Sequence, residues 1–167
     1  ISPESFFQTN SMGVKTLYDI IKKYANVGTG DTVIDLCCGT GSIGIYLSAL
    51  AKKVIGIEIE RGAVLDAIDN AKINKISNSE FIHSDINKIK NNIFNKFDQE
   101  VIVVDPPRAG LDKNLIKKIS CSNFKRLIYV SCNPASFARD IKIFESYGCV
   151  LKRAIPIDMF PQTYHIE

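Results

Sequence analysis

The chain has 167 residues, of which 46% are hydrophobic and 23% charged, and its formal net charge is +3 at pH 7. This length and hydrophobic content predict one folded domain with a sizeable core and exclude a disordered chain. The small basic excess permits a polyanionic partner but does not require one.

Predicted helices and strands alternate along the chain. Helical spacing of apolar residues predicts helices over 12–25 (with Asn10 or Ser11 as cap), 43–51, 61–74, around Leu115–Ile119 and over 135–147, and helix plus loop over 86–97. Short apolar runs predict strands over Thr32–Cys37, Lys53–Glu58, Glu80–His83, Val101–Asp105, Arg126–Cys132 and Val150–Ile157. This alternation predicts an α/β fold with a doubly wound, mostly parallel sheet. No linker rich in Gly, Pro or Ser divides residues 1–167, so we expect a single domain.

Cysteine usage bears on compartment and metal binding. The five cysteines are odd in number and lie mostly in apolar runs, which favours a reducing, intracellular compartment over a disulfide framework. Without paired Cys-x-x-Cys spacing, we expect no zinc or iron–sulfur site. No apolar run reaches membrane-spanning length, so we expect no membrane partner. Cytoplasm, nucleus and mitochondrion are not distinguished.

A glycine-rich loop follows the first predicted strand. Gly39, Gly41 and Gly44 form the pattern G-x-G-x-x-G before a helix, where backbone and helix N-terminus can approach a ligand. Glu58 ends the next strand, where a carboxylate accepts hydrogen bonds from ribose hydroxyls. A NAD-binding domain or a plain tight turn would look similar. The helix before the first strand, and Asp35 just before the loop, favour S-adenosylmethionine (SAM) over NAD.

Two further strand ends carry reactive side chains. Asp105 precedes Pro-Pro-Arg. The two prolines either have no role beyond ending the strand, or they help to present the Asp105 carboxylate to a substrate. A cysteine in an apolar strand is, taken alone, most often an inert core residue. Asn133 and Pro134, however, place Cys132 at a strand end, where the N-terminus of the following helix would lower the pKa of the thiol. Cys132 is therefore a candidate nucleophile. Cys121 and Cys149, by contrast, are expected in the core.

Five segments, in this order, resemble the catalytic domain of the RNA (uracil-5-)-methyltransferases. They cover essentially the whole chain and are Phe7–Asn10, Asp35–Gly41, Val104–Leu111, Tyr129–Pro134 and Phe160–Glu167. The Cys-Cys-Gly-Thr-Gly loop and the Phe-Pro-Gln-Thr ending look closest to the eukaryotic tRNA-type members, which make 5-methyluridine in the T-loop. The resemblance implies a Rossmann-like, SAM-dependent methyltransferase fold.

The resemblance also implies a mechanism and a set of site residues. Cys132 would add to C6 of uracil, C5 would take the methyl group of SAM, and Glu167 would remove the C5 proton. Asn133 would contact the RNA, and Arg108 would either contact it or hold Asp105. The implied SAM contacts are Gln8, Cys37, Gly39, Gly41, Ser42, Glu58 and Asp105. RNA, with tRNA favoured, is the expected partner, and we expect a monomer.

The sequence departs from the family at both ends and leaves other functions open. The family carries an accessory RNA-binding domain before this region and a final apolar strand after it, so we expect an excised catalytic domain with a truncated last strand. A nicotinamide-dependent oxidoreductase would explain the glycine loop but gives Cys132 no role. A non-catalytic RNA-binding module fits the charge, but an intact Cys132 and Glu167 argue against it. An N6-adenine or guanine methyltransferase would share Asp-Pro-Pro without needing a nucleophilic cysteine.

Overall fold

A five-stranded, fully parallel sheet forms the centre of the computed structural model, which describes residues 10–89, 94, 100–159, 162–163 and 166–167. The strands are β1 (Thr32–Leu36), β2 (Lys53–Glu58), β3 (Ser79–His83), β4 (Glu100–Val104) and β5 (Phe124–Tyr129). Their order in the sheet is β3-β2-β1-β4-β5, so the direction of winding reverses between β1 and β4. In open sheets of this kind, ligands bind at the carboxyl ends of the strands beside that reversal.

The helices are α1 (Ser11–Ala25), α2 (Ser42–Ser48), α3 (Arg61–Ile73), α4 (Lys113–Ser120) and α5 (Pro134–Ser146), with a short 3₁₀-helix, η1 (Ile86–Lys88). Side-chain caps fix several of their starts. Asn10 accepts a hydrogen bond from the N–H of Gly13 at 3.0 Å, and Asp112 accepts one from Asn114 at 2.8 Å. Such a cap contributes about 1 kcal/mol to helix stability. Of the two caps predicted for α1, Asn10 is the one used.

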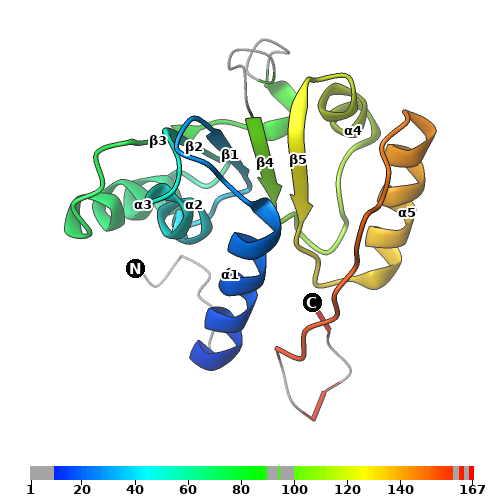
Figure 1. Cartoon of the computed structure of the whole chain (residues 1–167), viewed down its shortest axis with the longest axis horizontal. Helices are drawn as coiled ribbons and strands as arrows, with labels where there is room; N and C mark the ends of the chain where they lie inside the picture. Colours follow the sequence, from blue (N-terminus) through cyan, green and yellow to red (C-terminus); the bar gives the residue numbers. More distant parts are fainter. Residues whose placement is uncertain (1–9, 90–93, 95–99, 160–161, 164–165) are drawn as a thin grey trace.

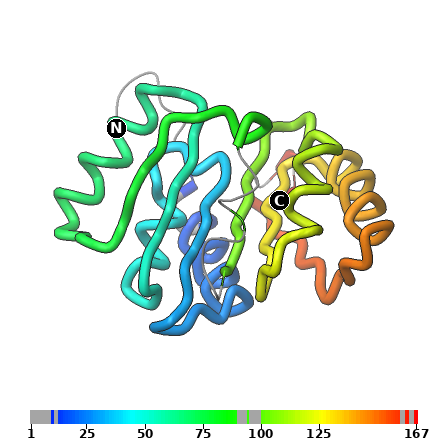
Figure 2. Tube along the Cα trace, turned by 90° about the horizontal axis from the view of Figure 1, so that it is seen from above, coloured from blue at the N-terminus to red at the C-terminus, as the bar shows by residue number. Residues whose placement is uncertain are grey.

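Helices cover both faces of the sheet: α1 and α4 lie on opposite sides of it (Figures 1 and 2). Consecutive strand residues point to opposite faces, so Val33 belongs to an apolar cluster with Leu17 of α1 and Leu47 of α2. Ile34 belongs to a second cluster with Ile116 of α4. Strands β1 and β4 are buried at every position, in keeping with their mainly apolar sequences, although Asp35 and Glu100 are buried in them too. The predicted α/β, doubly wound fold is confirmed.

Two predicted strands differ from the structure. β5 ends at Tyr129 rather than at Cys132, although the N–H of Val130 still donates to the carbonyl of Val104 at 2.9 Å. The sixth strand predicted over Val150–Ile157 was wrong, because this segment forms no regular strand and is mostly exposed. Pro156 has no N–H to donate to a ladder. Within 86–97, η1 and Phe94 are described; residues 90–93 and 95–99 lie outside the described part.

Candidate active site

The loop between β1 and α2 has a backbone that demands glycine at two positions. Gly39 and Gly41 have φ angles of +51° and +78°. A Cβ on Gly41 would also lie 2.7 Å from the ring of Phe81, whereas a Cβ on Gly39 would meet nothing within 4 Å. Gly41 is therefore enclosed by packing, while the backbone at Gly39 faces open space. The loop leaves room for a ligand to approach the main chain at Gly39.

Glu58, at the end of β2, is tied to this loop. Its Oε2 accepts the N–H of Gly39 at 3.0 Å, and its Oε1 accepts the N–H groups of Ile59 and Glu60 at 2.7 and 2.9 Å. The side chain is only 8% exposed. A carboxylate has about four acceptor positions, so three backbone donors leave capacity on Oε2. Glu58 thus fixes the loop and can still accept a hydroxyl donor.

Asp35 is the buried acid of β1, and it holds the start of α2. Its Oδ2 accepts the N–H of Gly44 at 2.9 Å, and a Cβ on Gly44 would lie 3.1 Å from that oxygen. Among the described residues, its Oδ1 has no hydrogen-bond partner. Burial raises the pKa of Asp35 to about 7, and the charges of Asp105 and Glu58 act in the same direction. Gly44, the third glycine of the motif, therefore allows α2 to pack closely against Asp35.

Asp105 directly follows β4, and the charge of Glu167 acts on it. The N–H of Asp105 donates to the carbonyl of Leu36 at 3.3 Å, so the carboxyl follows directly from the strand. Protein atoms crowd this side chain although part of it stays accessible, and the resulting desolvation raises its pKa to about 7. The negative charge of Glu167 raises that pKa further. Figure 1 shows the chain end near the carboxyl end of β5.

Cys132 lies in the turn between β5 and α5 and is partly exposed. The residues on both sides of it are fixed. Ser131 Oγ accepts the N–H of Asn133 at 3.2 Å, and Asn133 Oδ1 caps α5 by accepting the N–H of Ala135 at 3.0 Å. Asn133 Nδ2 donates to the carbonyl of Arg108 at 3.0 Å, which joins this turn to the loop after Asp105. Asn133 therefore has a structural role, and its contact with RNA stays a prediction.

Tyr18 of α1 is a site residue that the helical pattern did not identify. Its hydroxyl donates to Ser42 Oγ at 2.8 Å. Burial raises the pKa of Tyr18, and the charges of Asp35, Asp105 and Glu167 add to that rise. The hydroxyl thus joins α1 to the first residue of α2, directly after the glycine loop. The available signal was the residue type, since a tyrosine at the edge of a buried helical face usually directs its hydroxyl to a polar partner.

The remaining predicted residues have mixed outcomes. Gln8 lies outside the described residues, so its contact with SAM stays a prediction. Cys37 has a φ of +59°, and burial, with the charges of Glu58, Asp105 and Asp35, raises its thiol pKa to about 12. It lies in the loop and stays protonated. The expectation of a core position was wrong for Cys121, which is exposed at the end of α4, whereas Cys149 packs partly buried against the core.

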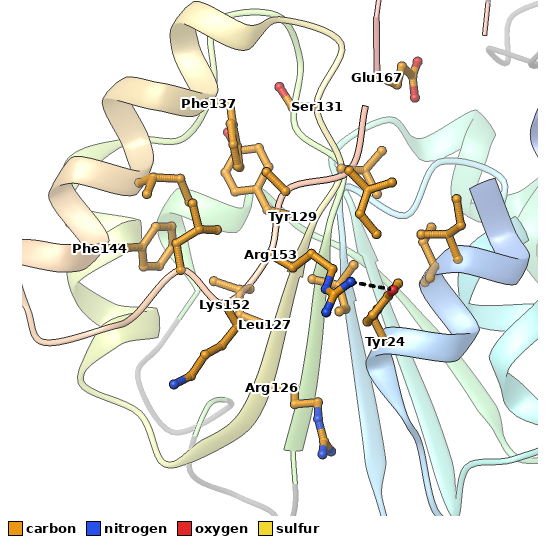
Figure 3. A pocket seen from close by; sticks show the side chains of 18 of the residues that line it. Tyr24, Arg126, Leu127, Tyr129, Ser131, Phe137, Phe144, Lys152, Arg153 and Glu167 are labelled. Carbon is orange, nitrogen blue, oxygen red and sulfur yellow. Dashed lines mark hydrogen bonds between the residues drawn. The ribbon is translucent and has the colours of Figure 1, made fainter. Parts of the chain in front are cut away.

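A groove of about 830 Å³ lies along β5, and we call it the β5 groove. Figure 3 shows Leu127 and Tyr129 of the strand in its floor, with Phe137 and Phe144 of α5 on one side. Arg153 crosses it to the hydroxyl of Tyr24 at 3.3 Å. Ser131 and Glu167 are among the residues that line the groove, so one part of it lies near the candidate active site. Its walls are mainly apolar. The described residues that line the groove include none of the glycine loop, and the SAM contacts expected at that loop stay a prediction.

Within the part of the chain that the structure describes, no group of three or more His, Cys, Asp and Glu side chains could hold a metal ion. No described helix is long and apolar enough to cross a membrane.

Comparisons with known proteins agree with this geometry. The chain is 46% identical, over all of its length and 37% of theirs, to uncharacterized RNA methyltransferases of Caldanaerobacter subterraneus subsp. tengcongensis and Oceanobacillus iheyensis. It thus spans about 37% of the length of these curated relatives. The likeness to eukaryotic members stays a prediction.

Comparison with solved structures also finds methyltransferases. The fold matches the Pyrococcus abyssi tRNA (uracil-54, C5)-methyltransferase in complex with S-adenosyl-L-homocysteine with a TM-score of 0.82 and 34% identity, over 99% of this chain and 39% of that one. The Synechocystis magnesium protoporphyrin IX methyltransferase, with a TM-score of 0.67 and 19% identity over 93% of this chain and 77% of that one, shares the fold alone. The Rossmann-like methyltransferase fold is therefore confirmed. Residues 2–167 match the family model described as tRNA (Uracil-5-)-methyltransferase, and the chain belongs to that family.

Proposed function

We propose that the protein transfers a methyl group from SAM to C5 of a uridine in RNA, with the T-loop of tRNA as the first target to test. One observation carries the proposal. The loop after Asp105 is hydrogen-bonded to the turn that holds Cys132, through Asn133 and the carbonyl of Arg108, and the charge of Glu167 acts on Asp105. A thiol and a carboxylate thus gather at the end of the sheet where this fold holds its ligand.

The glycine loop fits SAM on the evidence of its own residues. The open backbone at Gly39 leaves space for a ligand, and Glu58 keeps an acceptor position for a ribose hydroxyl. Two buried acids nearby, Asp35 and Asp105, have pKa values raised to about 7, so a positively charged ligand would favour their ionised forms. Cys37 and Ser42 flank the same loop. SAM supplies an electrophilic methyl group on a positively charged sulfonium.

Cys132 and Glu167 would perform the chemistry on the uracil ring. The Cys132 thiolate adds to C6, forming an S–C6 bond and moving the electron pair of the C5–C6 double bond toward C5, which makes C5 nucleophilic. Once C5 carries the methyl group, Glu167 takes the C5 proton. The electrons of that C–H bond restore the double bond, the S–C6 bond breaks, and the thiolate is regenerated. Partial exposure of Cys132 is compatible with access to a base.

Trapping with 5-fluorouridine-substituted tRNA tests this proposal, because fluorine at C5 cannot leave as a proton does. The complete protein with SAM should form a covalent complex that survives denaturing electrophoresis. Cys132→Ala should abolish the complex, while the matched variants Cys121→Ala and Cys149→Ala should retain it. Mass spectrometry that locates the adduct on another cysteine would overturn the assignment. Methylation by Cys132→Ala at the parent rate would point instead to a ring nitrogen, which attacks without a covalent adduct.

Calorimetry separates the proposal from the oxidoreductase alternative. The same glycine loop and acid could bind NAD, so the complete protein is titrated with SAM and with NAD in parallel. We expect measurable heat of binding with SAM only. Binding of NAD without SAM would overturn the methyltransferase proposal.

A further inference from the structure

Asp140 of α5 is completely buried, and its carboxylate accepts hydrogen bonds from three other residues. Its Oδ2 accepts the N–H of Leu111 and the hydroxyl of Tyr129, both at 2.7 Å. Its Oδ1 accepts Nε and Nη2 of Arg139 at 2.9 and 2.6 Å. A buried carboxylate is costly unless it is paired in this way. Asp140 therefore joins α5, β5 and the loop after β4 at one point.

Arg139 extends this contact along the same loop. Its Nη2 also donates to the carbonyl of Ala109 at 2.8 Å and approaches that of Leu111 at 3.5 Å. At the N-cap of α5, Asn133 Nδ2 donates to the carbonyl of Arg108. The loop over 106–111 is thus bound to α5 through its main chain, and the side chain of Arg108 stays exposed. The hydrogen bonds fix where the loop runs without using the groups that could meet a substrate.

Gly110 shows how closely the loop and the pair fit. Its φ is +76°, and its N–H closes a turn onto the carbonyl of Pro107 at 2.8 Å. A Cβ at this position would lie 2.5 Å from both Arg139 Nη2 and Asp140 Oδ2. Only glycine allows both the turn and the contact. The backbone conformation of the loop therefore depends on the position of the Arg139–Asp140 pair.

We infer that Asp140 and Arg139 are positioning residues for the proposed methyl transfer. The loop that they hold follows Asp105, and its Arg108 carbonyl is bound by Asn133, the neighbour of Cys132. The pair therefore sets the position of the nucleophile turn relative to the cofactor end of the sheet. It touches neither reacting group in the proposed reaction and acts through the loop. This inference rests on the proposed function.

The role of the pair is separable from folding. Helix α5 is also held by Phe144, which is 3% exposed in the apolar cluster of α4 and β1. The side chain of Arg139 is half exposed, so its removal leaves that cluster intact. Replacing Asp140 would instead leave the buried donors of Tyr129 and Leu111 without an acceptor, and such variants commonly unfold. Arg139 is therefore the residue to change.

The test compares Arg139→Ala and Arg139→Lys with the parent and with Lys142→Ala, an exposed control on the same helix, in the complete protein. Methylation of tRNA gives kcat and KM, calorimetry gives SAM affinity, and thermal unfolding gives Tm. We expect Arg139→Ala to lower Tm, because the buried Asp140 loses its charge partner. Assayed well below that Tm, it should also lower kcat by about 10–100-fold, the usual effect of misplacing reacting groups, with SAM affinity near the parent value. Arg139→Lys should recover only part of kcat, because an ammonium cannot reproduce the planar fork. Lys142→Ala should match the parent.

Hydrogen exchange of the free protein separates this inference from the proposed function. In Arg139→Ala, the amides of Gly110 and Leu111 should exchange faster than in the parent, with no RNA or SAM present. If the parent methylates no uridine, the proposed function fails, and exchange still reports whether the pair holds the loop. Unchanged exchange overturns the inference, as does faster exchange with kcat at the parent level. A kcat that falls only in proportion to SAM affinity or to the fraction of folded protein also overturns it.

Discussion

Ile157 and Glu167 exchange two backbone hydrogen bonds: the N–H of Ile157 donates to the carbonyl of Glu167 at 2.6 Å, and the N–H of Glu167 donates back at 3.0 Å. This reciprocal pattern is that of a hydrogen-bonded antiparallel pair. The two hydrogen bonds hold the main chain of Glu167. The charge of the Glu167 side chain raises the pKa of Asp105. The location of the proposed base is therefore set by the backbone, so its side chain can be changed without releasing the segment.

Replacing Glu167 with Gln should separate the two halves of the proposed reaction. The amide keeps the size of the side chain but cannot take the C5 proton, so addition of Cys132 and methyl transfer should proceed while release is blocked. The complete Glu167→Gln protein should accumulate methylated RNA attached to Cys132, even with ordinary uridine. Turnover should fall by about 10²–10⁴-fold, the usual contribution of proton-transfer catalysis. Denaturing electrophoresis and mass spectrometry of the adduct measure both.

A matched control lies in the same segment. Asp158 is exposed and neighbours Ile157, so Asp158→Asn changes a carboxyl there without touching the proposed base. It should turn over like the parent and leave no adduct. Free 5-methyluridine RNA released by Glu167→Gln at the parent rate would show that another group removes the proton.

Glu58 should govern SAM affinity. The Glu58→Ala variant loses the acceptor for a ribose hydroxyl, and it also releases the N–H of Gly39 that shapes the loop. Losing a hydrogen bond to a charged group weakens binding by about 1.5–3 kcal/mol. Isothermal calorimetry with SAM measures the change. Asp69→Ala, an exposed acid on α3, is the control and should bind like the parent. Equal affinity in the parent and Glu58→Ala would exclude the cofactor from this position.

Much of the fold could be predicted from local patterns. β1 and β4 have no exposed position, so most of their residues are apolar, and these short apolar runs are visible in the sequence. The segment Val150–Ile157 shows the limit of such patterns. Its apolar residues line the β5 groove, whereas a strand also needs a partner for its backbone. Apolar periodicity predicts that a segment packs against other apolar residues. It does not predict which neighbouring strand, if any, pairs with the backbone of the segment.

Some residues of the candidate site could be predicted from the sequence, and others could not. Glu58 was predicted because a carboxylate at a strand end is a local feature, but its three backbone donors come from loop geometry that the sequence does not contain. Asp140 was missed altogether. An Arg-Asp dipeptide in an amphipathic helix looks like a solvated face, and burial of the acid depends on Gly110 bringing a distant loop onto it. Residues that act through tertiary contacts carry little local signal.

Asp35 should make the stability of the ligand-free protein depend on pH. Its folded pKa of about 7 lies above its ordinary value of 3.8, so the folded state holds this proton more tightly than the unfolded state does. The resulting stabilisation is fully present below about pH 4 and is lost as pH rises through about 7. We therefore expect a higher free energy of unfolding at pH 5 than at pH 8, with an Asp35 contribution on the order of 1–4 kcal/mol.

Urea unfolding at both pH values checks this expectation. Asp35→Asn cannot titrate, so its stability should fall less between pH 5 and pH 8 than that of the parent, whatever its absolute stability. Asp105, whose pKa is also raised to about 7, should keep part of the dependence in that variant. The exposed control Asp69→Asn should follow the parent at both values, because it removes only a surface ion pair with Lys72, which contributes little to stability. A parent-like pH dependence in Asp35→Asn would mean that Asp35 is ionised in the folded protein, and that the N–H of Gly44 offsets its burial.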